Sequence, residues 1–359
     1  MISGLVDFLD TFDKEWVTFD IEIGLISICI GCDLNRIESE KVKTLIKNRN
    51  PLSNIILINT CVAYQTCTDT CDVILQYIKN NNKKRKVYII GCGSEHFKSK
   101  YPEFIFISKK DEFDIEAYNI PKTNDCKNFT EKALSLVKIQ SGCNNACSYC
   151  QIYKIRGKSV SETKESVLEE VQRQIDHGVR KITLTGVNVS QYMDPNDNSD
   201  LLDLLKYIVN NADIDSLQTY SIDPAWDRIF ELIDFIKSEP KMHKSLYLAA
   251  QSGSSKVLKL MNRKHDEKRL LDIIDKAKGL KLRYDIIVGH PGETEEDFEK
   301  TLNLIRLSQT HSMIGGQSKF TAHPGTPSAE MTDKVPEDII QERFDRLVEL
   351  ENEMIKGLE

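Results

Sequence analysis

The 359-residue chain lacks the features that mark exported and membrane proteins. Residues 1–20 are acidic and contain no basic segment followed by an apolar core, so they do not form a secretory signal. No apolar run approaches the roughly 20 residues that a helix needs to span a bilayer. We therefore expect a cytoplasmic protein with no membrane partner, and we expect it to be a monomer.

The chain also lacks an excess of positive charge, because 55 Asp and Glu residues outnumber 48 Lys and Arg residues and give a formal net charge of −7. It has no overall attraction for nucleic acid, so any RNA binding must come from a local patch or from a partner. Ten cysteines without a secretory signal indicate thiolate chemistry in a reducing compartment rather than disulfides.

Three of these cysteines form the most informative motif in the chain. Cys143, Cys147 and Cys150 follow C-x3-C-x2-C spacing, with Tyr149 directly before the last. Iron–sulfur clusters are normally held by four thiolates, so a three-thiolate loop leaves one iron open for another ligand. A zinc knuckle is the alternative, but zinc needs a second Cys/His pair, and none follows His177, the next histidine along the chain. The spacing therefore predicts a reactive iron–sulfur site.

Residues 1–120 alternate short apolar runs with helical patterns. Strands are expected at residues 23–30, 55–58, 87–90 and 103–107, with helices at 36–47 and around 73–78. Such alternation predicts a parallel sheet covered on both faces. We expect a small flavodoxin-like or Rossmann-like α/β domain, although it has no G-x-G-x-x-G string for a dinucleotide.

A cysteine stands at the end of each of the first three predicted strands. Cys32, Cys61 and Cys92 should therefore meet at one edge of the sheet, where α/β folds place ligands. Three thiols there could hold a second cluster, again with one iron open; buried structural thiols are the alternative. The remaining cysteines lack this placement, and we expect them to be structural: Cys29, Cys67, Cys71 and Cys126. Of these, Cys67 and Cys71 share a helical face and are the main alternative candidates for cluster ligands.

A polar, turn-prone linker is expected at residues 121–131, followed by a second domain at 132–330 and a C-terminal helix within 331–359. Strands expected at residues 134–140, 182–185, 246–250 and 282–288 alternate with helices, which predicts a partial (β/α) barrel. The loops after barrel strands form the active face. The cysteine loop and residues 186–188, 251–254 and 289–292 all occupy such loops.

These strings resemble the radical S-adenosylmethionine (SAM) methylthiotransferases of tRNA and ribosomal protein. The matching segments run in family order from about residue 23 to 350: IGC…ESE (30–40), INTC (58–61), IGC (90–92), IQSGCNNACSYC (139–150), LTGVN (184–188), QSGS…LKLMNRK (251–264), DIIVGHPGET (285–294) and PGTP (324–327).

The resemblance implies roles for individual residues. Two 4Fe–4S clusters are implied: one on the three-cysteine loop that binds SAM, and an auxiliary one on Cys32, Cys61 and Cys92. Tyr149, Ile287 and Gly289 match positions near the SAM adenine. Gly186 and Asn188 match positions that meet its methionine part, and Gln251 and Ser252 match positions near the ribose and substrate.

The resemblance also implies the reaction. A flavodoxin-type or ferredoxin-type donor would reduce the SAM-bound cluster, and the resulting radical would allow a methylthio group to be placed at C2 of a modified adenosine beside the tRNA anticodon. The LTGVN string (184–188) is most similar to the subgroup acting on N6-threonylcarbamoyladenosine. N6-isopentenyladenosine and a ribosomal-protein aspartate are the alternative substrates. A non-catalytic iron–sulfur or redox module is the alternative of a different class.

The chain departs from the family pattern after its last predicted helix. Relatives usually continue into a small β-barrel RNA-binding domain called TRAM. The sequence stops at Glu359, just after that helix, so we expect this domain to be either absent or removed. A partner would then supply affinity for the tRNA anticodon loop. Local basic stretches at residues 83–86, 154–158 and 263–269 are the other candidates for RNA contact, and 154–158 is favoured because it adjoins the cysteine loop.

Overall fold

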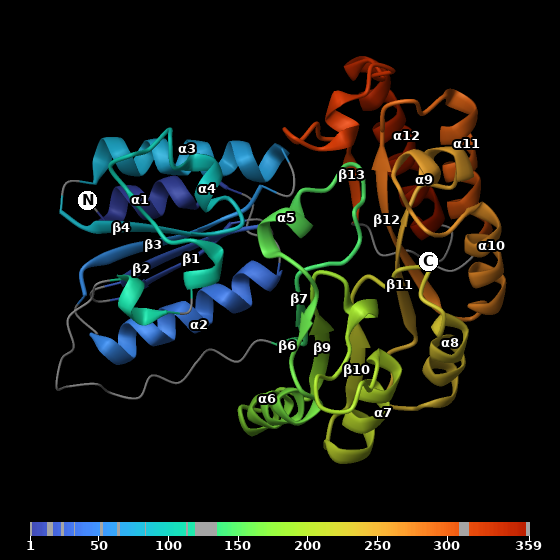
Figure 1. The fold of residues 1–359 in the computed structure, drawn as a ribbon, viewed down its shortest axis with the longest axis horizontal. Coiled ribbons are helices and arrows are strands. Elements are labelled where there is room, and N and C mark those ends of the chain that lie inside the picture. Colours follow the sequence, from blue (N-terminus) through green and yellow to red (C-terminus); the bar gives the residue numbers. More distant parts are fainter. Residues whose placement is uncertain are drawn as a thin grey trace. The chain divides into compact units, whose positions relative to one another are not determined.

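The computed structural model describes residues 2–12, 17–22, 25–31, 33–50, 53–62, 65–82, 84–112, 114–118, 135–308 and 316–356. The chain forms two compact units (Figure 1). The first unit comprises Met1–Leu134 together with Lys154–Arg156, and the second comprises Ser135–Tyr153 together with Gly157–Glu359. The expected linker at residues 121–131 lies outside the described residues.

The first unit is built on a five-stranded sheet in the order β1-β2-β3-β4-β5. Its strands are β1 (Val17–Glu22), β2 (Leu25–Ile30), β3 (Ile55–Thr60), β4 (Lys86–Gly91) and β5 (Ile105–Phe106). Its helices are α1 (Ile2–Leu9), α2 (Asp33–Arg49), α3 (Gln65–Asn81), α4 (Ser94–Phe97), η1 (Lys109–Asp111) and η2 (Ile115–Tyr118). Strands β2 to β5 pair in parallel, which confirms the predicted α/β class. β1 adds an antiparallel edge that the sequence analysis did not predict.

Helices cover both faces of this sheet, and every residue of β2 and β3 is buried. Ile28 and Ile58 point toward α3 and pack in one apolar cluster with Ile74. Leu57 points the other way and packs with Val42 of α2. Figure 1 shows α3 and α2 on opposite sides of the strands. Continuous apolar strands of this kind are typical of parallel sheets that are buried on both faces.

The second unit is an open (β/α) barrel of parallel strands, as predicted. One sheet has the order β10-β9-β6 and the other β11-β12-β13. The strands are β6 (Leu136–Lys138), β9 (Lys181–Thr185), β10 (Ser216–Thr219), β11 (Ser245–Gln251), β12 (Lys281–Val288) and β13 (Gln317–Lys319), beside the small hairpin of β7 (Gln140–Ser141) and β8 (Val160–Ser161). A parallel bridge between Ile222 and Leu248 joins the two sheets after β10.

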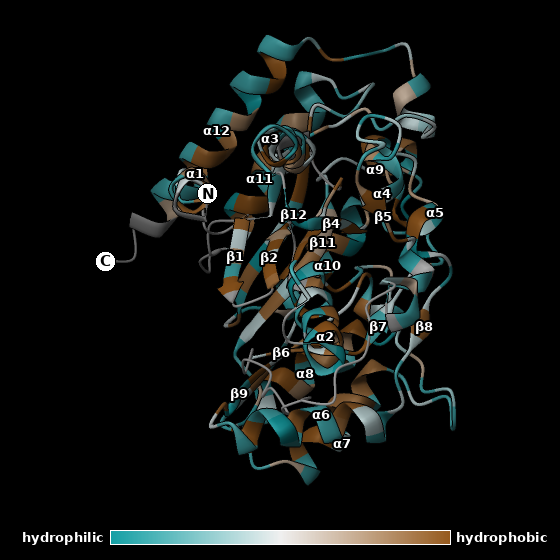
Figure 2. Ribbon diagram, turned by 90° about the vertical axis from the view of Figure 1, so that its left-hand side faces the viewer, coloured by the Kyte–Doolittle hydropathy of each residue, from teal (hydrophilic) through white to brown (hydrophobic). Residues whose placement is uncertain are grey.

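Helices alternate with these strands along the chain. They are α5 (Ile152–Arg156, of which Lys154–Arg156 belong to the first unit), α6 (Lys164–Asp176), η3 (Val189–Gln191), α7 (Leu201–Asn211), α8 (Ile229–Ser238), α9 (Ser255–Leu260), α10 (Glu267–Lys276), α11 (Glu295–Leu307), η4 (Pro327–Glu330) and α12 (Glu337–Lys356). Thr294 and Asp297 form a capping box that starts α11, which confirms the cap predicted there. Figure 2 shows hydrophilic and hydrophobic segments alternating along α12. Among the described residues, no helix combines the length and apolarity that a membrane crossing requires.

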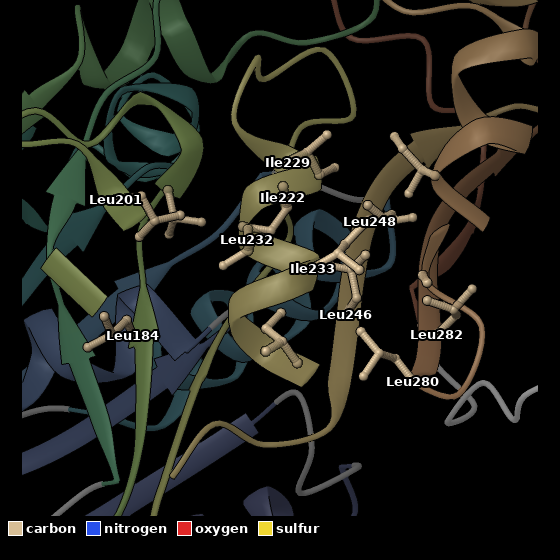
Figure 3. Close-up of a cluster of buried hydrophobic side chains, with 14 of the residues drawn as sticks. Leu184, Leu201, Ile222, Ile229, Leu232, Ile233, Leu246, Leu248, Leu280 and Leu282 are labelled. Atoms are coloured by element: carbon tan, nitrogen blue, oxygen red, sulfur yellow. The ribbon is translucent and has the colours of Figure 1, made fainter. Parts of the chain in front are cut away.

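The core of the second unit lies between the strands and the helices outside them (Figure 3). Leu248 and Leu282 point outward from β11 and β12 and belong to the same buried cluster as Leu232 of α8. Side chains alternate along a strand, so the intervening residues face the inside of the barrel. Along β12, Arg283 and Asp285 are half-buried on this inner face while their neighbours are buried in the core.

Candidate functional site

The three-cysteine loop lies between β7 and α5, and backbone hydrogen bonds fix its path. The N–H of Cys143 donates to the carbonyl of Gly157 at 3.0 Å and closes the base of the loop. Ser148 donates through its N–H to the carbonyl of Met261 at 3.0 Å and through its hydroxyl to that of Leu260 at 2.7 Å. These bonds tie the middle of the loop to the end of α9.

Each of the three thiols has an N–H group directed at its sulfur. Cys143 and Cys150 accept hydrogen bonds from the backbone N–H two residues further along the chain, both at 3.4 Å. The buried Cys147 accepts one from Nη1 of Arg263, also at 3.4 Å. Hydrogen bonds to the sulfurs are a recurring device by which proteins tune iron–sulfur clusters. The loop therefore has the surroundings expected for three cluster thiolates.

Burial raises the pKa of Cys150 to about 11 and also raises the pKa of Cys143, so these thiols are protonated unless a metal deprotonates them. Among the described residues, no three acidic, thiol or imidazole groups converge closely enough to hold one metal ion. A 4Fe–4S cube offers a separate iron to each thiolate, so its ligands need not converge on one point. Tyr149 lies in the same loop, and burial raises its pKa as well.

A buried ion pair supports the loop, and the sequence analysis did not identify it as part of the site. Nη2 of Arg263 donates to Oδ1 of Asp223 at 3.0 Å, and both side chains are largely buried. Asp223 also accepts a hydrogen bond at 2.8 Å from the side chain of Asn145 in the loop. Arg263 thus bridges a thiol and a carboxylate, and is not part of the exposed basic stretch suggested for RNA contact.

The loop after β9 brings Gly186 and Asn188 to the same end of the barrel. The backbone N–H of Asn188 donates to Oε1 of Gln140 at 3.0 Å. A Cβ on Gly186 would lie 2.9 Å from Gln140, so this close approach requires glycine. Oδ1 of Asn188 is buried and makes no hydrogen bond within the described chain. Because an unpaired buried acceptor is costly, this oxygen is suited to receive an N–H from a ligand.

The end of β11 is strained at Gln251. This buried residue has a φ of +68°, and the pairing of β11 with β12 shifts register just before it. Left-handed backbone at a non-glycine residue is a feature that clusters at functional sites. Ser252 is fully buried, and its hydroxyl contacts Thr301 at 3.3 Å and accepts the N–H of Ser254 at 3.1 Å. Ser252 therefore supports the loop from within.

The end of β12 positions Ile287 and Gly289. Ile287 is half-buried on the inner face of the barrel. Gly289 has a φ of +83°, and a Cβ there would lie 2.4 Å from Ile340. Its N–H donates to Oε2 of Glu293 at 2.8 Å, and Glu293 is itself paired with Arg343. The predicted SAM-contact residues of the second unit thus lie at the carboxyl ends of its strands or in the loops that follow them.

In the first unit, Asn35 joins the ends of the strands that carry the other predicted thiols. Its amide donates to the carbonyls of Ile30 and Thr60, each at 3.3 Å, and its Oδ1 lies 3.9 Å from Sγ of Cys92. A Cβ on Gly31, at the end of β2, would lie 2.8 Å from Sγ of Cys61. The structure therefore places two predicted thiols at one edge of the sheet; the third, Cys32, lies outside the described residues.

The cysteines taken as structural are buried where they are described. Sγ of Cys71 lies 3.4 Å from the backbone N–H of Cys61, and burial raises the pKa of Cys71 well above its usual value. Cys29 and Cys67 are also buried. Cys126 lies outside the described residues. Burial also raises the pKa of Cys92 and of Cys150, so burial and pKa alone do not separate these cysteines from the proposed ligands.

Arg156 belongs to the first unit by its contacts and is buried there. Its Nε donates to Sγ of Cys92 at 3.1 Å, and its two terminal nitrogens bind the carboxylate of Glu38 at 2.9 and 3.0 Å. Lys109 also binds Glu38 at 2.6 Å. Arg156 is therefore an internal ion-pair residue beside a predicted cluster ligand, and the RNA contact suggested for residues 154–158 does not extend to it.

Replacing Glu38 with glutamine should destabilise the protein by about 3 kcal/mol at pH 7, as the shift of its pKa indicates. Burial alone would raise that pKa, but Lys109 and Arg156 outweigh burial and lower it from 4.5 to about 2. The ion pairs therefore stabilise the fold above about pH 4.5, and this contribution is lost as the pH falls through about 2. The difference between wild type and Glu38→Gln in denaturant unfolding should shrink over that range.

A matched control is Glu116→Gln, which removes an ion pair with Arg49. The side chain of Glu116 is exposed in this pair. Exposed pairs contribute at most about 1 kcal/mol, so this variant should unfold almost like wild type at every pH. Equal destabilisation by the two substitutions would contradict the role assigned to the buried pair.

Comparison with known proteins places this geometry in context. Residues 137–305 match the Radical SAM superfamily. The tRNA-2-methylthio-N(6)-dimethylallyladenosine synthase of Clostridium botulinum (strain Langeland / NCTC 10281 / Type F) is 31% identical over 371 residues, which cover 90% of this chain and 80% of that protein. A protein of the same name from Nocardia farcinica (strain IFM 10152) is 38% identical over 229 residues, covering 61% of this chain and 45% of that protein.

Among solved structures, the radical S-adenosylmethionine methyltransferase TsrM from Kitasatospora setae, with cobalamin and a 4Fe–4S cluster bound, is similar with a TM-score of 0.56. The alignment covers 77% of this chain and 63% of that chain at 13% identity, so the likeness concerns the fold alone.

Proposed function

Because the chain belongs to the radical SAM methylthiotransferases, we propose that it places a methylthio group at C2 of an N6-modified adenosine beside the anticodon of a tRNA. Family membership makes it an enzyme of the transferase class. The names of its relatives specify tRNA and N6-dimethylallyladenosine. N6-threonylcarbamoyladenosine, which the LTGVN string favours, is the other candidate substrate, and a cytoplasmic location follows from a tRNA substrate.

The observation that carries this proposal is the meeting of two features at one end of the barrel. Three thiols each receive an N–H hydrogen bond, and the buried Oδ1 of Asn188 is left for a ligand. The Asn188 side chain also acts on Cys143, partly opposing the rise in pKa that burial causes, so the two groups are neighbours. A cluster bound to the loop would supply the electron that cleaves SAM.

The residues around the loop would then hold SAM in place. Asn188 would accept an N–H from the amino group of the methionine part, and Gln140 holds the Asn188 backbone in position. Ile287 and Gly289 would border the adenine, and Gln251 would lie toward the ribose. Arg263, held by Asp223, offsets the negative charge of the Cys147 thiolate. Positioning of this kind is the main contribution of a protein to cofactor chemistry.

We extend the proposal to a second 4Fe–4S cluster in the first unit, held by Cys32, Cys61 and Cys92. Two contacts support this extension of the proposal. Asn35 joins the ends of the strands that carry the thiols, and Arg156 donates a hydrogen bond to the sulfur of Cys92. A flavodoxin-type or ferredoxin-type electron donor and the tRNA anticodon loop are the proposed partners.

The decisive experiment is anaerobic incubation of the iron- and sulfide-reconstituted protein with SAM, a reductant and tRNA, followed by mass spectrometry. We expect 5′-deoxyadenosine and a methylthiolated adenosine in the digested tRNA. Formation of neither product would support the alternative of a non-catalytic iron–sulfur module. Formation of 5′-deoxyadenosine with no change in any tRNA would reject tRNA as the substrate and direct attention to a ribosomal-protein aspartate.

A further inference from the structure

Helix α12 packs beside α11, β12 and β13 in the second unit (Figure 1). Ile340 and Leu347 are buried in this packing, and so is the charged side chain of Arg343. The Radical SAM match ends at residue 305, so it assigns no role to this helix. A buried guanidinium is tolerated only when it is well paired, so the partners of Arg343 show what the helix holds in place.

Arg343 binds the chain between β12 and α11. Its Nη1 donates to Oε2 of Glu293 at 3.1 Å and to the carbonyl oxygen of the same residue at 3.2 Å. Its Nε donates to Oε2 of Glu295 at 3.1 Å. The guanidinium therefore holds both the backbone and the side chain of Glu293, and Glu295 fixes the orientation of the guanidinium.

Glu293 passes this constraint on to Gly289. The oxygen that Arg343 binds, Oε2, also accepts the N–H of Gly289 at 2.8 Å, and the Glu293 side chain is 1% exposed. Burial raises the pKa of Glu293 to about 7, whereas the Gly289 N–H and Arg343 oppose that rise. Arg343 thus favours the ionised form of this carboxyl group, which is the stronger acceptor for the N–H.

A second residue of α12 contacts Gly289 directly. A Cβ on Gly289 would overlap the side chain of Ile340, which is buried and lies one turn before Arg343 on the same face of the helix. Gly289 and Gly292 both have left-handed backbone, with φ values of +83° and +84°. Glycine-containing turns have many accessible conformations, so a turn of this kind needs outside contacts to keep one of them. Ile340 and Arg343 supply such contacts.

We propose that Arg343 and Ile340 are positioning residues for SAM, because they hold the turn after β12 in the conformation that borders the adenine. The role rests on the proposed function, in which Ile287 and Gly289 lie beside that ring. A turn that is already ordered before SAM arrives loses less conformational entropy on binding, so α12 raises the affinity for SAM without touching it.

The test is the affinity of the reconstituted full-length protein for SAM, measured by calorimetry without reductant. Arg343→Lys keeps the positive charge but cannot bind Glu293 and Glu295 in the same forked geometry, so the Kd of SAM should rise about tenfold. L-Methionine shares one part of SAM and lacks the adenine, so its Kd, measured by competition with SAM, should change by less than about twofold. Unchanged SAM affinity, or equal weakening of both ligands, would overturn the inference.

Arg346→Lys is the matched control on the same helix. Like Arg343, Arg346 pairs with Glu295 and lies over the ring of Phe298, but its other ion pairs are to Glu299 and Glu342. The control should bind SAM like the wild type. Equal loss of SAM affinity in the control would show that α12 acts through general stability, and would reject the positioning role.

Ile340→Ala removes the contact with Gly289 and leaves the ion pairs of Arg343 in place, so it decides the question if Arg343→Lys does not fold. It should weaken SAM binding by about threefold or more and leave L-methionine binding unchanged. Hydrogen exchange of residues 286–294, measured by mass spectrometry on protein without clusters, should speed up by about tenfold in either variant. Wild-type exchange and SAM affinity in a folded variant would overturn the inference while the methylthiolation of tRNA stands. Selective loss of SAM affinity in a protein that modifies no tRNA would support the inference and reject the proposed reaction.

Discussion

Replacing Cys147 with alanine should lower the rate of SAM cleavage by at least about three orders of magnitude. Cys147 is the middle thiol of the loop, is buried, and is the one that receives the hydrogen bond of Arg263. A cube held by two thiolates has lost a third of its protein ligands. The measurement is 5′-deoxyadenosine formed by the reconstituted variant under anaerobic conditions with SAM and reductant.

Folding of this variant should be preserved, because Arg263 remains paired with Asp223 after the sulfur is removed. Cys67→Ala is the matched control: this thiol is also buried, but it lies in α3 and belongs to neither proposed set of ligands. The control should cleave SAM at the wild-type rate. Cleavage retained by Cys147→Ala would show that the loop does not hold the SAM-binding cluster.

The sequence predicted the features that follow from local pattern. Apolar runs gave the parallel strands of both units, and the string from Thr294 to Asp297 gave a helix cap that the structure contains. Cysteines placed directly after strands were expected to share an edge, and Cys61 and Cys92 do so through Asn35. These predictions succeeded because strand period, capping and strand-end position are properties of neighbouring residues.

Contacts between distant residues could not be predicted in the same way. Arg156 was expected at a basic surface but is buried against Glu38, and Arg263 was likewise assigned to a basic stretch but is paired with Asp223. The sequence does not show whether an arginine lies in an exposed patch or in a buried ion pair, because its partner is distant in the chain. Only the tertiary structure distinguishes the two. The edge strand β1 was missed although residues 17–22 (VTFDIE) alternate strictly between apolar and polar side chains, which is the pattern of a half-buried strand.

Replacing Cys61 with alanine should separate the two halves of the proposed reaction. Cys61 lies in the first unit at the end of β3, and its side chain fills the space beside Gly31. The substitution removes the sulfur and keeps the Cβ, so the first unit should fold. We expect SAM cleavage within about threefold of wild type, because the three-cysteine loop is intact, while the methylthiolated nucleoside falls below detection in mass spectrometry of the digested tRNA.

The matched control for this variant is Cys71→Ala, since Cys71 lies against the backbone of Cys61 but outside the proposed ligand set. It should form methylthiolated product at nearly the wild-type rate. Normal product from Cys61→Ala would exclude Cys61 as a ligand of the sulfur-supplying cluster. Loss of SAM cleavage in the same variant would show that the two sets of thiols do not act separately. If the two clusters have separate roles, Cys61→Ala must retain SAM cleavage and lose methylthiolated product. Radical formation needs only the thiolates of the three-cysteine loop, whereas sulfur transfer needs both sets of thiolates.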